Sequence, residues 1–502
     1  MSDNLLRSVA IVGGGVAGWM AAAALSRVLR GGTAIHVVAG PCPPEDDVHA
    51  TEMATLPAIG RFHENLGIDE AEMLRVTDGT FRLGTAFYDW SAAGRSYFHP
   101  MGEIGANLNG IAFRHHWLKL REAGAVIPFE DFSVSGTAAR TGKFTRPATD
   151  KRSVLSTLEY GYHLDSVRYA GLLRRQALQR GVTETTTATM AAQLHNETGF
   201  VEALIVDGGA RVEAELFIDC TGLLIEGALK CGFEDWTRWL GCDRVVSIAT
   251  SAMDSLPPCT RATACASGWQ WQIPLKHRTG NGYVYSSAHV GDEEAMVGLL
   301  GNLEGEAIGE ARTMRFTSGR RKQLRAKNVV ALGPAAAVLE PLESASLHLI
   351  QASISRLLAL FPDRTFSQIE ADEYNRVVGG EIERLRDFLI LHYHATKRSD
   401  TPFWNHCRTM EVPDTLGHKL EQFRSRARIV LYDEETFGEP SWASVLIGQD
   451  IVPRRVDPFM ETLNLDELRK QAQRIHSVIR QGADSMPSHR TFLEKYCAAR
   501  TG

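Results

Sequence analysis

Several features that would place a chain in a specialised class are scarce in this sequence. The longest stretch without a polar side chain, residues 9–25, is shorter than the roughly 20 residues of a membrane span, and glycines interrupt it. The first residues lack a basic segment and a cleavage site, so we expect no signal peptide, no membrane contact and a cytoplasmic protein. The 8 cysteines show no CxxC spacing and no HExxH pattern occurs, so we expect neither a disulfide framework nor a metal site.

A strong charge of one sign is also absent. The chain has 54 Lys and Arg against 60 Asp and Glu, a formal net charge of −6, so nothing attracts it generally to nucleic acid. Hydrophobic residues make up 44% and charged residues 23%, which is ordinary for a globular protein. The 502 residues allow roughly two to four domains or subdomains.

A glycine-rich turn between a strand and a helix is the first clear signal. The expected strand is 8–12 and the expected helix is 19–29, with the sequence GGGVAG at 13–18 between them. In a G-x-G-x-x-G turn the first glycine makes the bend, the second lets the backbone approach a pyrophosphate, and the third lets helix and strand pack closely. We therefore expect a dinucleotide to be bound by this turn, through Gly13, Gly15, Val16, Ala17 and Gly18.

The acidic residue that usually holds the ribose is missing after the second strand, 33–39. Glu45, Asp46 and Asp47 follow in a longer loop and could substitute for it. A distant strand at 328–332 that runs into Gly333 favours FAD over NAD, because FAD is long enough to be clasped by segments far apart in the sequence. We expect modest FAD affinity.

The remaining patterns predict an α/β protein. Expected strands are 79–90, 201–206, 214–218, 269–274 and 283–288, and expected helices are 55–66, 166–180, 344–361, 368–395, 416–426 and 465–481. We expect a hairpin turn at 207–209 and a loop that contains 279–282. The change to helices suggests a division into a core of residues 1–365, which binds FAD and holds the substrate tunnel, and a helical C-terminal subdomain of residues 366–502 packed on that core.

One motif brings a family into view. Gly268 is followed by Trp269, Gln270, Trp271, Gln272, Ile273 and Pro274, which resembles the G-W-x-W-x-I-P motif of the flavin-dependent (tryptophan) halogenases. Further resemblances run along almost the whole chain, at 51–52, 81–90, 98–100, 217–222, 340–344 and 401–404. The resemblance implies a Rossmann-like FAD-binding core of the flavin-monooxygenase (GR2) type with an additional sheet. It adds Glu52, Gly333 and Leu339 to the residues near the flavin.

The resemblance also implies a reaction. Reduced FAD from a separate flavin reductase reacts with oxygen and chloride or bromide, and hypohalous acid travels through a tunnel to a small aromatic, indole- or tryptophan-like substrate. Trp269 and Trp271 are implied to keep the substrate away from the flavin. Other implied residues of the tunnel and substrate pocket are Ile273, Pro274, His99, Pro100 and Met101, and those of the halide site are Ala345 and Ser346. The resemblance leaves open whether the protein forms a homodimer.

The catalytic pair departs from the family pattern at one position. Glu343 matches the family's glutamate, but Arg82 stands where the family has the lysine that captures hypohalous acid. A desolvated lysine can lose its proton and attack halogen, whereas arginine keeps its charge with a pKa above about 12. Arg82 can therefore hydrogen-bond the oxidant but is a poor nucleophile. We expect Arg82 and Glu343 to face one cavity; an ordinary ion pair of Arg82 with a carboxylate is an equal alternative.

Three functions remain in competition. The first is a flavin-dependent halogenase, which the two motif tryptophans favour. The second is a flavin-dependent monooxygenase that acts on its substrate directly. The third is a catalytically impaired flavin-binding paralogue, which Arg82 and the missing ribose acid favour. Thr51, where the family has glycine, and Met101, where tryptophan-specific members have phenylalanine, also depart from the pattern.

Overall fold

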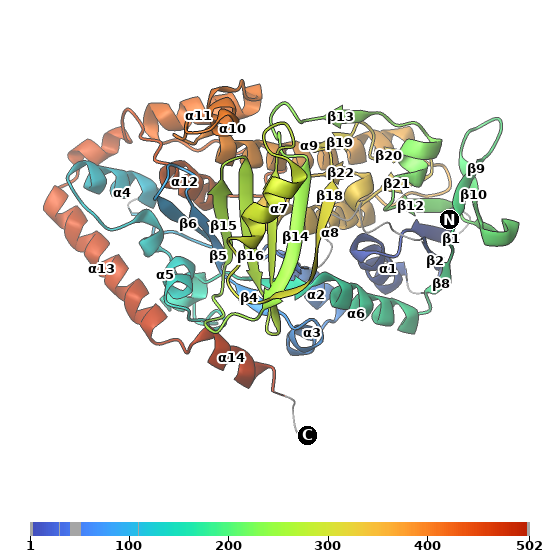
Figure 1. Cartoon of the computed structure of the whole chain (residues 1–502), viewed down its shortest axis with the longest axis horizontal. Helices are drawn as coiled ribbons and strands as arrows, with labels where there is room; N and C mark the ends of the chain where they lie inside the picture. The colour runs from blue at the N-terminus through green and yellow to red at the C-terminus, as the bar shows by residue number, and fades with distance from the viewer. Residues whose placement is uncertain (1–3, 30, 41–51, 109, 499–502) are drawn as a thin grey trace. The chain divides into compact units, whose positions relative to one another are not determined.

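A computed structural model describes residues 4–29, 31–40, 52–108 and 110–498 (Figure 1). The chain forms two compact units, and each is assembled from three separate segments. The first unit comprises Met1–Thr77, Leu164–Arg244 and Thr313–Glu383, and the second unit comprises Asp78–His163, Val245–Arg312 and Arg384–Gly502. The division expected from the sequence, at residue 365, follows composition instead of these groupings, and it stays a prediction. Glu45, Asp46, Asp47 and Thr51 lie outside the described residues.

A largely parallel sheet organises the first unit. Its central strand β1 (Ser8–Val12) is parallel to β2 (Ala34–Ala39) and β12 (Leu216–Asp219), in the order β20-β21-β12-β1-β2-β8. The outer strands are β8 (Thr183–Thr186), β21 (Val329–Ala331) and the antiparallel β20 (Arg325–Ala326). Val9 to Val12 are buried, as expected of a parallel strand with both faces covered.

Helices and two small sheets complete the first unit. Helix α1 packs against β1, β2, α6 and α8. The helices of this unit are α1 (Val16–Leu29), α2 (Ile59–Leu66), α3 (Glu70–Val76), α6 (Ser166–Gln179), α8 (Ala345–Ala359) and the start of α9 (Gln368–His394). The small sheets are β9 (Met190–Leu194), β10 (Val201–Val206) and β11 (Arg211–Glu213), and β13 (Phe233–Asp235), β19 (Gly319–Arg321) and β22 (Ala337–Val338). A further short strand is β3 (Glu52–Ala54).

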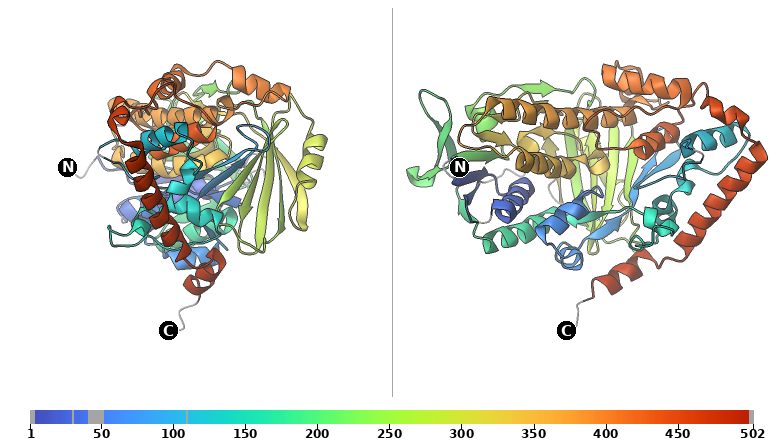
Figure 2. Two further views of the ribbon diagram at one scale, coloured as in Figure 1. Left: turned by 90° about the vertical axis from the view of Figure 1, so that its left-hand side faces the viewer. Right: turned by 180° about the vertical axis from the view of Figure 1, so that it is seen from behind.

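A seven-stranded sheet, which lies mainly in the second unit, has the order β18-β14-β17-β16-β15-β5-β6. Its strands are β5 (Gly84–Tyr88), β6 (Ser96–Pro100), β14 (Arg244–Ser251), β15 (Thr260–Cys265), β16 (Gly268–Pro274), β17 (Arg278–Tyr285) and β18 (Ala307–Arg315). Helix α7 (Asp292–Leu300) covers one face of this sheet (Figure 1, Figure 2). The buried contact joins Ala295 and Leu299 of α7 to Tyr283, Tyr285 and Val246 of the sheet.

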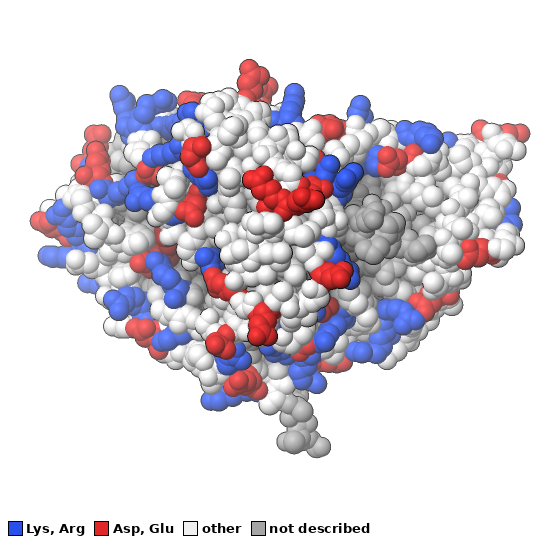
Figure 3. Space-filling model, viewed as in Figure 1, with Lys and Arg blue, Asp and Glu red and all other residues white. Residues whose placement is uncertain are grey.

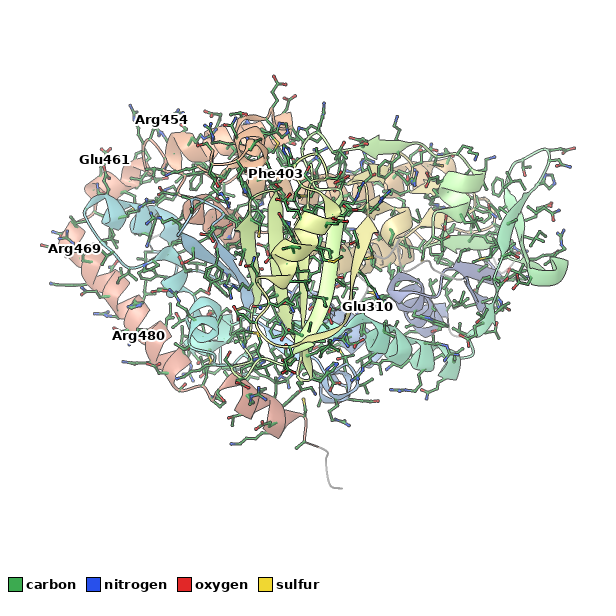
Figure 4. The ribbon with its side chains drawn as sticks, in the orientation of Figure 1. Glu310, Phe403, Arg454, Glu461, Arg469 and Arg480 are labelled. Carbon is green, nitrogen blue, oxygen red and sulfur yellow. The ribbon has the colours of Figure 1, made fainter. Side chains whose placement is uncertain are left out.

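The rest of the second unit is mostly helical. Its helices are α4 (Phe113–Glu122), α5 (Val134–Arg140), α10 (Pro402–Thr409), α11 (Asp414–Arg426), α12 (Glu439–Gly448), α13 (Leu465–Asp484) and α14 (His489–Tyr496). Strand β4 (Thr80–Arg82) pairs antiparallel with β7 (Gly161–Asp165). Asn464 caps α13 by accepting from two backbone N–H groups, and exposed Arg469 and Arg480 project from that helix (Figure 4).

Most predicted elements are present, and the α/β class is confirmed. Three predictions were wrong. The expected single strand 79–90 is divided into β4 and β5, which belong to different sheets. Residues 279–282 lie inside β17 and pair with β16; they do not form a loop. The segment 214–218 does not form a hairpin with β10: β11 does so, and β12 joins the parallel sheet instead. Helix α2 begins at Ile59, later than expected, because Pro57 disfavours helix at the residue before it.

In the part of the chain that the structure describes, no helix is long and apolar enough to cross a membrane. Basic and acidic side chains are interspersed over the face in Figure 3, as the near balance of charges predicts.

Candidate functional site

The glycine-rich turn after β1 leaves an open cradle at the start of α1. A Cβ built at Gly18 would lie 2.0 Å from the carbonyl oxygen of Gly13, so α1 can pack on the turn only with glycine there. A Cβ at Gly15, in contrast, would meet no atom of the described residues within 4 Å. Packing within the chain therefore does not require glycine at 15. The N-terminus of α1, which has no acidic residue in its first turn, suits a phosphate beside Gly15.

The end of β21 returns to this turn, as the sequence predicted. Gly333 has φ of 59°, and a Cβ there would lie 2.8 Å from the Cβ of Ala17. Gly333 also lines a small cavity with Leu339 and Ser346. The full lining is Gly333, Pro334, Ala337, Leu339, Ser346, Leu349 and Ile350. Two predicted cofactor residues and one predicted halide residue thus lie around one cavity.

The start of α8 leaves polar groups available at this cavity. The hydroxyl oxygen of Ser346 is buried and has no hydrogen-bond partner among the described residues. Ser344, the N-cap residue of α8, makes no side-chain cap hydrogen bond, and Ala345 is fully buried. The open cradle at Gly15 and the orphaned Ser346 hydroxyl fit a bound dinucleotide and a small anion. Glu52 begins β3 and is half-buried in the same unit.

Two consecutive residues before α8 adopt a left-handed backbone conformation. Glu343 has φ of 57° and Ser344 has φ of 61°, and neither is glycine. Both are buried, with Glu343 4% exposed. This conformation costs about 1–2 kcal/mol for each residue, and such strain gathers at functional sites. Glu343 is therefore held in place by its surroundings at some cost in stability.

Arg82 lies at the end of β4 and belongs to the second unit. Its side chain is 1% exposed. Its Nε donates a hydrogen bond to the Thr260 hydroxyl at 3.0 Å, and its Nη2 donates to the Thr85 hydroxyl at 2.6 Å. Glu343 belongs to the first unit, so the meeting of Arg82 and Glu343 in one cavity stays a prediction.

Two buried histidines flank the strand that carries Arg82, and the sequence analysis missed both. His163 contacts the hydroxyls of Thr80 and Thr260. Burial, followed by the positive charge of Arg82, lowers the pKa of His163 well below its ordinary value. His489 accepts a hydrogen bond from the Phe81 N–H at 3.1 Å, and burial lowers its pKa to about 4. Both histidines are therefore neutral, and no spacing in the sequence relates them to Arg82.

The two motif tryptophans lie on the same face of β16, and their ring centroids are 6.1 Å apart. Trp269 is 1% exposed and also packs against Trp90, with centroids 6.0 Å apart. Trp271 is half-buried and lies over its cross-strand partner Gly282, where a Cβ would be 2.1 Å from the indole ring. The glycine in β17 thus makes room for Trp271. Ile273 and Pro274 are buried at the end of β16.

An aromatic cluster surrounds His99. The ring centroid of His99 lies 5.8 Å from that of Phe388 and 6.0 Å from that of Phe437, and Phe388 packs edge-on against Trp442. We call His99, Phe388, Phe437 and Trp442 the His99 cluster. Pro100 and Met101 are buried directly after His99. His99 was predicted from the sequence, whereas Phe388 and Phe437 were not, because these come from distant segments of the chain.

Similarity to known proteins extends over both units. A family model described as tryptophan halogenase matches residues 8–464. The tryptophan 6-halogenase ThaL of Streptomyces albogriseolus is 31% identical over 461 residues, 87% of this chain and 85% of that protein. The solved structure of BrvH, a flavin-dependent halogenase from Brevundimonas sp. BAL3, is 41% identical with a TM-score of 0.94 and covers 98% of this chain and 100% of its own. A flavin-dependent halogenase structure from Xanthomonas campestris is 40% identical with a TM-score of 0.94, and the match covers 98% of this chain and 99% of that chain.

Proposed function

The chain belongs to the tryptophan halogenase family and is a flavin-dependent halogenase of aromatic compounds, and we propose that it halogenates an indole-like ring with Arg82 at the position of the family's lysine. The observation that supports this most is the burial of Arg82, whose guanidinium is held by the hydroxyls of Thr85 and Thr260. A guanidinium fixed in a water-poor interior can orient a small polar oxidant by donating hydrogen bonds to it.

We assign the cofactor and the halide to the first unit. Gly15, Val16 and Ala17 would hold the pyrophosphate of FAD, because the N-terminus of α1 is open there. The cavity residues Gly333 and Leu339 would contact the flavin. Reduced FAD, delivered by a separate reductase, supplies hypohalous acid from oxygen and a halide when it is bound. Ala345 and Ser346 would hold chloride or bromide, since a helix N-terminus favours an anion.

Arg82 and Glu343 would then have different roles in the reaction. Arg82 remains protonated at every ordinary pH, so it donates hydrogen bonds to the oxygen of hypohalous acid and forms no bond to the halogen. Glu343, which is buried, is the group that we expect to take the proton from the halogenated ring. The motif tryptophans would keep the ring away from the flavin. The His99 cluster offers aromatic surface that suits an indole ring.

The experiment that tests this proposal supplies every component and removes one at a time. The protein is incubated with a flavin reductase, NADH, FAD, bromide and a panel of indoles, and products are identified by mass spectrometry. We expect a brominated indole that disappears when reductase, FAD or bromide is omitted.

The same measurement separates the competing functions. A hydroxylated product that forms without bromide would favour a monooxygenase. Flavin binding without any product, from a correctly folded protein, would favour the impaired paralogue. Catalase added to a parallel reaction controls for products made by free hydrogen peroxide and bromide.

A further inference from the structure

A chain of hydrogen bonds connects Arg82 to the last residue of the β16 motif. The hydroxyl of Thr80 lies 2.8 Å from the carbonyl oxygen of Pro274 and 3.0 Å from Nδ1 of His163. On the other side of the imidazole ring, Nε2 of His163 lies 2.9 Å from the hydroxyl of Thr260. Thr260 in turn contacts Nε of Arg82 at 3.0 Å. All five residues belong to the second unit and are buried.

The two ends of this chain determine the direction of three of its four bonds, and the protonation of His163 determines the fourth. A carbonyl oxygen can only accept, so Thr80 must give its one hydroxyl proton to Pro274. Thr80 therefore accepts from His163, and Nδ1 of His163 must carry a proton. At the other end a guanidinium N–H can only donate, so Thr260 accepts from Arg82. The Thr260 oxygen has two lone pairs, so the last direction depends on the ring. A neutral His163 that carries its proton on Nδ1 has an unprotonated Nε2, and Thr260 then donates to it.

We infer that His163 is a positioning residue for Arg82, held as the neutral Nδ1–H tautomer so that Thr260 donates to its Nε2 while accepting from the guanidinium. The environment agrees with a neutral ring. Burial disfavours protonation of His163 most, and among the described residues the charged and titratable groups that act on it, Arg82 and His489, disfavour it as well. A doubly protonated His163 would donate to Thr260, which could then no longer donate to the ring, and the direction of the chain would be lost.

The consequence for the reaction follows from the proposed function of Arg82, on which this inference rests. Thr260 and Thr85 fix two N–H groups of the guanidinium, so its plane and its remaining N–H groups have one orientation. Hydrogen-bond orientation of hypohalous acid requires such fixation, because arginine cannot compensate by forming a covalent bond to halogen. His163 would thus matter more in this chain than beside a lysine.

The tautomer can be observed without substrate, flavin or turnover. In protein labelled with ¹⁵N-histidine, the ¹⁵N shifts distinguish protonated from unprotonated ring nitrogens, and the His163→Gln variant assigns the signal. We expect a protonated Nδ1 and an unprotonated Nε2 for His163. A protonated Nε2 would overturn the inference, since Thr260 could not then donate to it.

Turnover tests the positioning role. We measure brominated indole formed per NADH consumed, together with FAD affinity. His163→Phe should lower this ratio about tenfold or more while FAD affinity stays unchanged, because small misplacements of a reacting group cost up to about a hundredfold. His163→Gln, whose amide oxygen can accept from Thr260, should recover part of the loss. The double variant His163→Phe/Thr260→Val should lower the yield of brominated indole per NADH no more than Thr260→Val alone, because His163 acts through Thr260.

A matched control exists in the first unit. His36 also bridges two threonine hydroxyls, of Thr183 at 2.7 Å and Thr185 at 3.0 Å, so His36→Phe removes a similar bridge that does not involve Arg82. We expect His36→Phe to form brominated indole per NADH consumed within about twofold of the wild type. The positioning role would be refuted if His36→Phe and His163→Phe lowered the yield of brominated indole per NADH equally. It would also be refuted if the effects of His163→Phe and Thr260→Val on this yield were additive in the double variant. A wild type with the Nδ1–H signature but no product would refute the proposed function and leave the hydrogen-bond chain supported.

Discussion

Replacing Gly15 with alanine should separate cofactor binding from folding in this protein. Within the described part of the chain, a Cβ at Gly15 would meet no atom within 4 Å, and Gly15 is not among the residues with positive φ, so alanine fits without strain. The free energy of unfolding should stay equal or rise by about 0.4–1 kcal/mol, because alanine restricts the unfolded chain. Bound FAD would meet the new methyl group. Loss of one or two charge-assisted hydrogen bonds, each worth about 1.5–3 kcal/mol, lowers affinity at least about tenfold.

Gly18→Ala is the matched comparison. Its Cβ would lie 2.0 Å from a backbone oxygen, so the turn or α1 must move, which costs about 1–3 kcal/mol. The assay combines urea denaturation without FAD and a titration that follows flavin fluorescence. We expect Gly15→Ala to be stable and to bind FAD poorly, and Gly18→Ala to be unstable. Wild-type FAD affinity in Gly15→Ala would refute the placement of the pyrophosphate, and a large loss of stability would assign Gly15 to folding.

Three further predictions follow from particular residues. Glu343→Gln should abolish halogenation, because an amide cannot take up the proton, while FAD affinity and the free energy of unfolding in a urea titration stay close to those of the wild type, because the backbone and the side-chain volume are kept; a fully active Glu343→Gln would contradict the role of this residue. Gly282→Ala should displace the Trp271 ring and change tryptophan fluorescence while FAD affinity is retained; an unchanged spectrum would contradict the packing described. Burial lowers the pKa of His489 and of His115 from 6.5 to about 4, so the unfolded chain binds protons before the folded chain does as the pH falls. The free energy of unfolding should therefore be highest above about pH 6.5 and decrease towards pH 4. A His489→Gln variant whose free energy of unfolding decreases with pH as steeply as that of the wild type would exclude His489 as a source.

The nucleotide turn could be predicted from the sequence because its physics is local. A buried strand, three glycines and a helix follow one another within residues 8–29, and each glycine acts on its immediate neighbours or on a phosphate. The residues around the small cavity came from the family resemblance instead. Gly333, Leu339 and Ser346 are separated from the turn by some 300 positions, so periodicity alone could not have grouped them.

Long-range packing explains what the sequence analysis missed. Glycines at 280 and 282 favour a loop by local preference, yet β17 needs Gly282 because Trp271 occupies the space of a side chain. The support of Arg82 joins β4, β7 and β15, and the direction of its hydrogen bonds depends on a proline carbonyl in β16. No one of these segments carries a recognisable signal for the others.

The central claim, that this chain halogenates with a buried arginine in the place of lysine, is tested most directly at Arg82 itself. Wild type, Arg82→Lys and Arg82→Met are compared under identical reductase turnover with FAD, bromide and indole, and brominated indole is quantified by mass spectrometry. We predict bromide-dependent product from wild type, more from Arg82→Lys, whose amine can be neutralised by desolvation, and none above background from Arg82→Met. Equal product from wild type and Arg82→Met, at equal FAD binding, would contradict the claim.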